Sequence, residues 1–187
     1  MEKNEGALFQ VDVVLTDQDY LEYNMFWLTK SPYGQKETKT MRKILTIAFG
    51  LWIFAILLGG SFSIGAILKT IPPLAIYIIF QLFLNKFYFL LLKWQMKNLK
   101  KTGKMGYSPV ATIDFFEERF VETTPDGKTE MNYSAVERIS VVTDKIIYIH
   151  LNNILSYLLP LSCFQTQEEY QAFLQFISGK CAQIDRY

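Results

Sequence analysis

The sequence offers few side chains that could act as acid, base or nucleophile, and these do not form a recognisable catalytic group. His150 is the only histidine, so a metal site built from histidines is excluded, and a catalytic triad would have to use this one residue. It stands in the run KIIYIHL, on the same alternating face as Ile146 and Tyr148. We therefore predict a packed or edge-exposed histidine and not a general base.

Acidic pairs and cysteines give no clearer indication of chemistry. Glu117-Glu118 and Glu168-Glu169 are neighbours in sequence, and neighbours point to different faces of a strand or helix, so we interpret both pairs as solvated surface. Cys163 and Cys181 lack the close spacing of a metal or redox motif. No Walker loop, dinucleotide fingerprint, nucleophile elbow or zinc ribbon occurs. The sequence thus predicts a protein that is not an enzyme, with no catalytic residue, metal or cofactor.

A set of lysines offers a different chemistry, the attraction of anionic lipid. Lys86 and four later lysines are spaced by 7, 4, 3 and 4 residues, which places them on one stripe if the segment is a helix. The candidate lipid-contact residues are Lys93, Lys97, Lys100, Lys101 and Lys104. Near an anionic surface each is worth about 1 kcal/mol. The alternative, which we favour, is charge that only fixes topology, and the two roles can coexist.

Composition and the placement of charge predict that these lysines adjoin a membrane. Half of the 187 residues are hydrophobic, 16% are aromatic and only 20% are charged, which is rich in apolar residues for a soluble chain. Between Ile44 and Leu92 the only charged residues are Lys69 and Lys86. The net charge of +1 gives no indication of nucleic-acid binding. Residues 1–43 contain no apolar core, so we expect no cleavable signal peptide.

Two membrane spans are predicted, at residues 44–68 and 72–92. The first is a run of 25 residues without a formal charge, more than the roughly 20 that a helix needs to cross the hydrocarbon. Pro72-Pro73 suit a tight turn and the first turn of the next helix, which makes the pair an antiparallel hairpin. Ten basic residues flank the outer ends, and only Lys69 lies in the connection. Both termini are therefore expected on the cytoplasmic side of the cell membrane.

Two features inside the spans are interpreted as structural. Lys86 lies in the cytoplasmic half of the second span, from which its long stem can reach the headgroups. Small residues at Gly59 and Ser63, and at Ser61 and Gly65, have the spacing that lets helix backbones approach closely. We favour packing within the hairpin, with a homodimer as the alternative.

The polar segments on either side predict short strands and two amphipathic helices. Residues 8–15 alternate as a strand does, and residues 17–30 form a helix behind Asp17 as candidate N-cap, lying either at the membrane interface or against the cytoplasmic domain. Thr166 and Glu169 have capping-box spacing for a C-terminal helix. Six further strands are predicted at residues 110–116, 119–123, 128–133, 136–142, 145–151 and 154–161.

These elements predict an α+β membrane protein. A curled antiparallel sheet, with the C-terminal helix plugging its open side, is the natural arrangement for six strands and one amphipathic helix, and we expect the N-terminal strand to join it as a seventh. The predicted organisation is a cytoplasmic strand and amphipathic helix at residues 1–43, a transmembrane hairpin at 44–92, a basic juxtamembrane helix at 93–106 and a cytoplasmic domain at 107–187.

Four segments carry a resemblance to a known family. They are LTDQDYLEYN at residues 15–24, MNYSAVERIS at 131–140, IIYIHLNN at 146–153 and LLPLSCF at 158–164. With the two-span hairpin, they make the chain resemble the YcxB-like membrane proteins of Gram-positive bacteria over nearly its whole length. The resemblance implies that the C-terminal domain is pleckstrin-homology-like (PH-like), and it implies no catalytic residues.

The expected function is that of a membrane-anchored, non-enzymatic module. The hairpin would hold the PH-like domain at the inner leaflet, where it binds a protein partner or lipid headgroups. The alternative is an immunity protein that protects its producer against a bacteriocin or secreted toxin, a role suggested by analogy with other small two-span proteins. A neighbouring toxin gene would favour that alternative.

Overall fold

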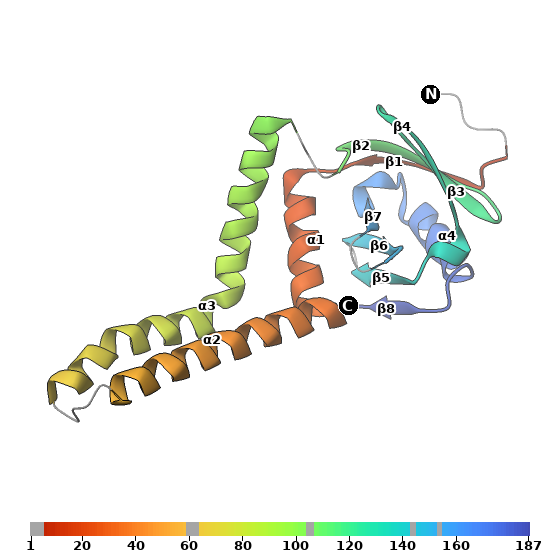
Figure 1. Ribbon diagram of the computed structural model, residues 1–187. Coiled ribbons are helices and arrows are strands. Elements are labelled where there is room, and N and C mark those ends of the chain that lie inside the picture. Colours follow the sequence, from red (N-terminus) through yellow and green to blue (C-terminus); the bar gives the residue numbers. More distant parts are fainter. Residues whose placement is uncertain (1–5, 59–63, 104–106, 143–144, 153–154) are drawn as a thin grey trace. The chain divides into compact units, whose positions relative to one another are not determined.

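The computed structural model describes residues 6–58, 64–103, 107–142, 145–152 and 155–187 (Figure 1). The chain forms two compact units. The first comprises residues 1–20 and 105–187, and the second comprises residues 21–104. The first unit is built mainly of strands and the second is helical, so the protein mixes helices with largely antiparallel sheets.

The strands form two four-stranded sheets in the first unit. One sheet has the order β1-β2-β3-β4 and the other the order β7-β6-β5-β8. All pairs are antiparallel except the parallel pair of β5 with β8. The strands are β1 (Phe9–Val14), β2 (Val110–Phe115), β3 (Arg119–Thr124), β4 (Gly127–Asn132), β5 (Arg138–Val142), β6 (Ile146–His150), β7 (Ser156–Pro160) and β8 (Ile184–Arg186).

The N-terminal strand pairs with a strand of the C-terminal segment, as expected, but in one of two four-stranded sheets and not as the seventh strand of a single sheet. Val11 of β1 lies opposite Ile113 of β2, and Val13 lies opposite Ala111. All four side chains are buried, because residues directly opposite in an antiparallel pair share a face. The six later strands are also present as β2 to β7. The eighth, β8, escaped prediction because a segment of three residues is too short to show an alternation.

Helix α4 (Gln167–Ser178) closes the core of this unit. Its Phe173 is fully buried, and the ring lies 4.8 Å from that of Phe115 and 5.5 Å from that of Phe9, centroid to centroid. The predicted cap is confirmed, since the Thr166 hydroxyl oxygen accepts a hydrogen bond from the Glu169 backbone N–H at 3.2 Å. The helix therefore packs against aromatic residues of the first sheet. Short 3-10 turns follow β4 (Tyr133–Ala135) and β7 (Leu161–Cys163).

Helix α1 (Asp17–Lys30) has the predicted range but a different cap. The N-cap is Thr16 and not Asp17, because Thr16 Oγ1 accepts from the Asp19 N–H at 3.2 Å while Asp19 Oδ2 accepts from the Thr16 N–H at 2.8 Å. This exchange satisfies two backbone donors at once, as in a capping box. Asp17 instead accepts a hydrogen bond from the Tyr107 hydroxyl at 3.3 Å.

The second unit contains two long helices, α2 (Pro32–Leu58) and α3 (Ile64–Thr102). Helix α1 ends at Lys30, and α2 begins two residues later at Pro32. The two helices approach closely at this point. The Gly34 N–H donates to the Ser31 hydroxyl at 2.9 Å, and a Cβ at Gly34 would lie 2.2 Å from the Trp27 carbonyl oxygen. In Figure 1, the first half of α3 runs beside α2, and α3 then bends.

The predicted turn between the two helices, at Pro72-Pro73, is wrong. Helix α3 begins at Ile64 and contains Pro72 and Pro73, so residues 64–68 belong to the second helix and the prolines form no turn. Proline's fixed φ fits a helix, and the hydrogen bonds it removes are tolerated in membrane-spanning helices because neighbouring groups replace them. Residues 59–63, and with them Gly59, Ser61 and Ser63 of the small-residue motif, lie outside the described residues.

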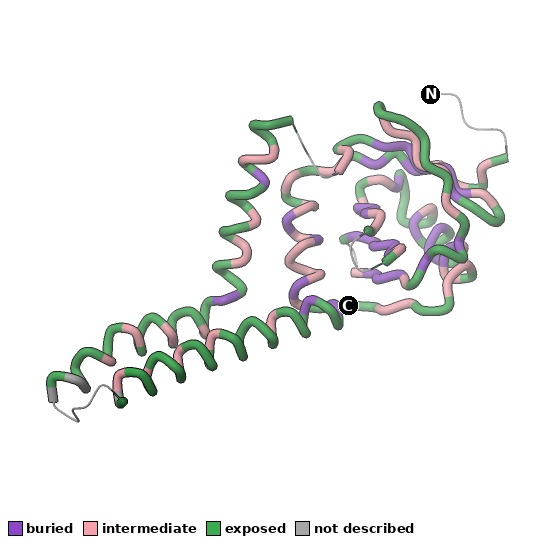
Figure 2. The backbone as a smooth tube through the Cα atoms, viewed as in Figure 1, coloured by how far each residue is buried: buried purple, intermediate pink, exposed green. Residues whose placement is uncertain are grey.

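Among the described residues, one helical segment, Leu68–Thr102, is long and apolar enough to cross a membrane. Its apolar side chains are exposed along much of its length, with Leu82 at 71% and Leu90 at 60%. Figure 2 shows mostly exposed residues along both long helices, whereas strands such as β2 and β6 are mostly buried. The predicted first span, at 44–68, falls partly on residues 59–63, outside the part of the chain that the structure describes.

Candidate functional site

The lysines predicted to contact lipid lie at the C-terminal end of α3. Lys93, Lys97, Lys100 and Lys101 are all exposed, and Lys104 lies outside the described residues. Because α3 is continuous from Ile64 to Thr102, the condition for a stripe is met, and Lys93, Lys97 and Lys100 lie within about 60° of one another around the helix. The apolar helix therefore carries its cations directly on its own extension.

The end of α3 is set by a glycine. Gly103 has a φ of +67°, in the left-handed region, and its N–H donates to the Lys100 carbonyl at 3.2 Å. A left-handed glycine just past the last turn is a common helix stop, since it satisfies carbonyls that the helix leaves free. Cations in the last turn also offset the negative end of the helix dipole. The described lysines of the stripe thus lie in the last turns of the helix.

Lys86, the lysine inside the predicted span, contacts an aromatic ring. Its ammonium nitrogen lies 5.1 Å from the centroid of the Phe83 ring, within the range of a cation–π contact. The side chain is exposed. Among the salt bridges of the described residues, none pairs Lys86 with an acid. That its long stem reaches the headgroups stays a prediction.

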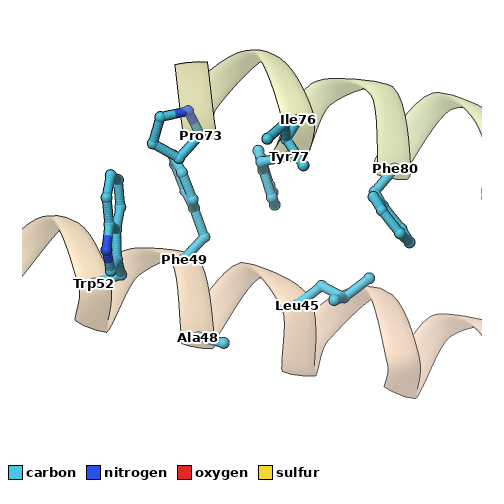
Figure 3. A pocket seen from close by; sticks show the side chains of 8 residues that line it. All are labelled: Leu45, Ala48, Phe49, Trp52, Pro73, Ile76, Tyr77 and Phe80. Atoms are coloured by element: carbon cyan, nitrogen blue, oxygen red, sulfur yellow. The ribbon is translucent and has the colours of Figure 1, made fainter. Parts of the chain in front are cut away.

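Helices α2 and α3 are joined by aromatic and polar contacts that the sequence did not reveal. Figure 3 shows Phe49 of α2 beside Tyr77 of α3, and the two rings stack at 4.5 Å. The Tyr77 hydroxyl lies 2.9 Å from the Thr46 hydroxyl, to which Gln81 Nε2 donates at 3.2 Å. Gln81 Nε2 also donates to the Arg42 carbonyl at 3.2 Å. Such interhelical hydrogen bonds hold helices together in lipid, where apolar burial does not.

Next to this network, α2 and α3 enclose an open apolar groove of about 390 Å³. Its lining comprises Leu45, Ala48, Phe49, Trp52, Pro73, Ile76, Tyr77 and Phe80 (Figure 3). Among these lining side chains, the only polar atoms are the Tyr77 hydroxyl oxygen and the Trp52 indole nitrogen. The groove is suited to packing of hydrocarbon and supplies no acid or base. The one signal in the sequence was the isolated polar residues Thr46 and Gln81 inside apolar runs.

His150 is buried, as one of its two predicted environments required. It is 2% exposed, with Nδ1 2.7 Å from the Ser156 hydroxyl and Nε2 3.0 Å from the Ser140 hydroxyl. Burial, helped by the positive charge of Arg138 and opposed by Asp185, lowers the pKa of His150 to about 4. The ring is therefore neutral at pH 7 and bridges β5 and β7. Ser140 is itself 1% exposed, which keeps both groups away from a substrate in solvent.

The acidic pairs and the cysteines do not come together. Glu117 is exposed and forms a salt bridge with Lys180, whose ammonium also lies 5.3 Å from the Phe176 ring centroid. Glu169 belongs to the α4 cap region, where its carboxylate accepts from the Gln165 N–H at 2.7 Å. Both cysteines are free. Among the described residues, no cluster of three or more His, Cys, Asp or Glu side chains could hold a metal ion.

Comparison with known families identifies one part of the chain. The YcxB-like protein family model matches residues 115–177, about a third of the sequence, from the end of β2 through α4. Comparison with curated proteins and with solved structures gives no significant match. The matched segment includes the buried histidine and the capped helix but neither of the long helices.

Proposed function

We propose that this chain, whose residues 115–177 form a domain of the YcxB-like family, is a membrane-anchored, non-enzymatic module. In this proposal α2 and α3 cross the bilayer as a two-span hairpin with both termini in the cytoplasm. The β-rich unit is a PH-like domain held at the inner leaflet. There it binds a protein partner or lipid headgroups, and the lysines at the end of α3 are the candidate contacts for anionic headgroups.

The observation that carries the proposal is the continuity of α3. One unbroken helix joins the mostly exposed, apolar residues 68–92 to four exposed lysines within its last ten residues. An apolar helix of this length fits the hydrocarbon thickness, and lysines just beyond it lie where the surface potential of anionic lipid is strongest. The acid-free network of Thr46, Tyr77 and Gln81 supports an anchor and not an ion path, which would need ionisable partners in the membrane.

The headgroup contact is tested by lysine reactivity in lipid nanodiscs. We expect Lys93, Lys97, Lys100 and Lys101 to react more slowly with an amine-specific reagent in discs containing phosphatidylglycerol than in discs of phosphatidylcholine alone. Lys128, an exposed lysine of β4, serves as the matched control and should react equally in both. Equal reactivity of the α3 lysines in the two lipids would remove the headgroup contact from the proposal.

The protein contact is tested in cells. A photo-crosslinking residue at an exposed position of the β-rich unit, such as Glu118, should capture the same protein in repeated experiments. The same residue at Lys69 of α3, which the proposal places on the other side of the membrane, is the control. Capture at neither position, or equal capture at both, would argue against a partner of the cytoplasmic domain.

A further inference from the structure

Strand β4 is an edge strand with its residues open to solvent. In the order β1-β2-β3-β4 it pairs with β3, and the described residues place no strand on its other side. Five of its six residues are exposed, and Met131 is half-buried. An edge of this kind presents unpaired N–H and C=O groups to which another strand can add. Strand addition is a recurring mode of protein recognition.

The charges on β4 favour one partner, a second copy of β4. Charged side chains usually discourage pairing at an edge. Here Lys128 and Glu130 lie on either side of Thr129 in the sequence and share one face of the strand, opposite to that of Thr129. In an antiparallel pair about a twofold axis at Thr129, Lys128 of each copy lies opposite Glu130 of the other. Opposite charges directly across an antiparallel pair stabilise it.

Neighbouring registers do not have this complementarity. A twofold axis at Lys128 would put two lysines face to face, and an axis at Glu130 would put two glutamates face to face. Like charges directly opposite are destabilising. Pairing about Thr129 also sets the two Thr129 side chains side by side, a pair that sheets favour, and sets Gly127 opposite Met131 without a clash of bulky groups. The sequence of β4 therefore selects a single register for self-pairing.

The sheet behind β4 extends the same charge pattern. Arg119 Nε of β3 lies 3.5 Å from Glu130 Oε1, and both side chains are more than half exposed. In the self-paired arrangement, Glu130 would lie between Arg119 of its own chain and Lys128 of the other copy. The outer face would then carry alternating charges across the junction of the two sheets.

We infer that β4 is the contact between two copies of this chain, which pair antiparallel about a twofold axis at Thr129 and join their sheets into one. A closed twofold contact of this kind uses the same surface patch on both copies. The inference holds whether or not the lysines of α3 bind lipid, and it goes beyond the proposed function.

Disulfide crosslinking of the full chain in detergent micelles tests the register. In a background with Cys163→Ser and Cys181→Ser, Thr129→Cys should form a disulfide-linked dimer, because directly opposite Cα atoms lie about 4.5–5.5 Å apart. Lys128→Cys alone should crosslink poorly, since its own counterpart would be about 8 Å away, while mixed with Glu130→Cys it should crosslink. Glu137→Cys, exposed but outside β4, is the control.

Charge exchange tests the same contact independently. In the Thr129→Cys background, Lys128→Glu alone and Glu130→Lys alone should each slow crosslinking about tenfold, because two attractive pairs become repulsive. A mixture of the two variants should recover the rate as a heterodimer, since every opposed pair is then attractive. Lys128→Glu leaves the Arg119–Glu130 ion pair intact, so slower crosslinking of this variant cannot come from loss of that ion pair. Glu137→Lys should change nothing.

Two results would overturn the inference. One is crosslinking of Thr129→Cys no faster than that of Glu137→Cys. The other is a mixture of the charge variants that crosslinks no faster than either variant alone. Either outcome would leave β4 as an edge kept apart by its charges.

Discussion

The burial of His150 gives a quantitative prediction about pH. The ring lies between Ser140 and Ser156 at 2% exposure, with Arg138 and Asp185 as the charged groups acting on it. Burial disfavours the charged imidazolium and is the main cause of the lowered pKa, about 4 compared with an ordinary 6.5. We therefore expect the folded β-rich unit to resist protonation of this histidine across the mildly acidic range.

The sign and the size of the effect follow from linkage. In the unfolded chain His150 takes up a proton below pH 6.5, whereas in the folded chain it does so only below about pH 4. Its contribution to stability is therefore constant above pH 6.5 and is lost as the pH falls from 6.5 toward 4. A difference of one in pKa is worth about 1.4 kcal/mol, so the loss across this window is about 3 kcal/mol.

Nuclear magnetic resonance of the full chain, labelled with ¹³C at histidine, measures this pKa directly. The chain has one histidine, so a single titration curve needs no assignment. We expect the histidine carbon resonances of the folded protein to stay close to those of a neutral imidazole above pH 5. Hydrogen exchange of β5 and β6 should show that the native chain loses stability as the pH is lowered. The loss should be smaller in His150→Gln, which keeps every carboxylate and lacks only the histidine. A folded-state midpoint at pH 6.5 or above would refute the reasoning.

Three further predictions concern the packing of each unit. Thr166→Ala removes the α4 cap and should lower the free energy of unfolding by about 1 kcal/mol, seen as faster hydrogen exchange in the first turn of α4. Phe173→Ala empties a fully buried site and should cost about 3–5 kcal/mol, measured as protease sensitivity of residues 107–187, with exposed Gln175→Ala as a neutral control. Gln81→Leu breaks the link between α2 and α3 and should weaken the hairpin by about 0.6–1.7 kcal/mol; unchanged distances between spin labels on the two helices in increasing denaturant would contradict this.

The β-rich unit could be predicted well because its signals are local. Alternation of apolar residues located β2 to β7, and the spacing of Thr166 and Glu169 located the start of α4. The choice of Asp17 over Thr16 as N-cap failed because both are good capping residues. Only the reciprocal bonds with Asp19 distinguish them.

The helical unit was harder to predict because hydropathy does not show where a helix begins. The apolar run continues without a charge through residues 59–68, and the Pro72-Pro73 pair was the strongest local signal for a turn. Helix α3 nonetheless contains both prolines. The contacts of Tyr77 with Thr46 and Phe49 join residues 31 and 28 positions apart in sequence. They depend on how α2 and α3 face each other, which no pattern within one helix reveals.

The central claim, that a two-span anchor holds the β-rich unit at the cytoplasmic face, is tested most directly by cysteine labelling in intact cells. Single cysteines are placed at Lys69 and at Glu118 in a Cys163→Ser, Cys181→Ser background, and a membrane-impermeant maleimide is added before or after permeabilisation. We predict that Lys69→Cys is labelled in intact cells and Glu118→Cys only after permeabilisation. Labelling of both cysteines from the same side of the membrane would contradict the claim.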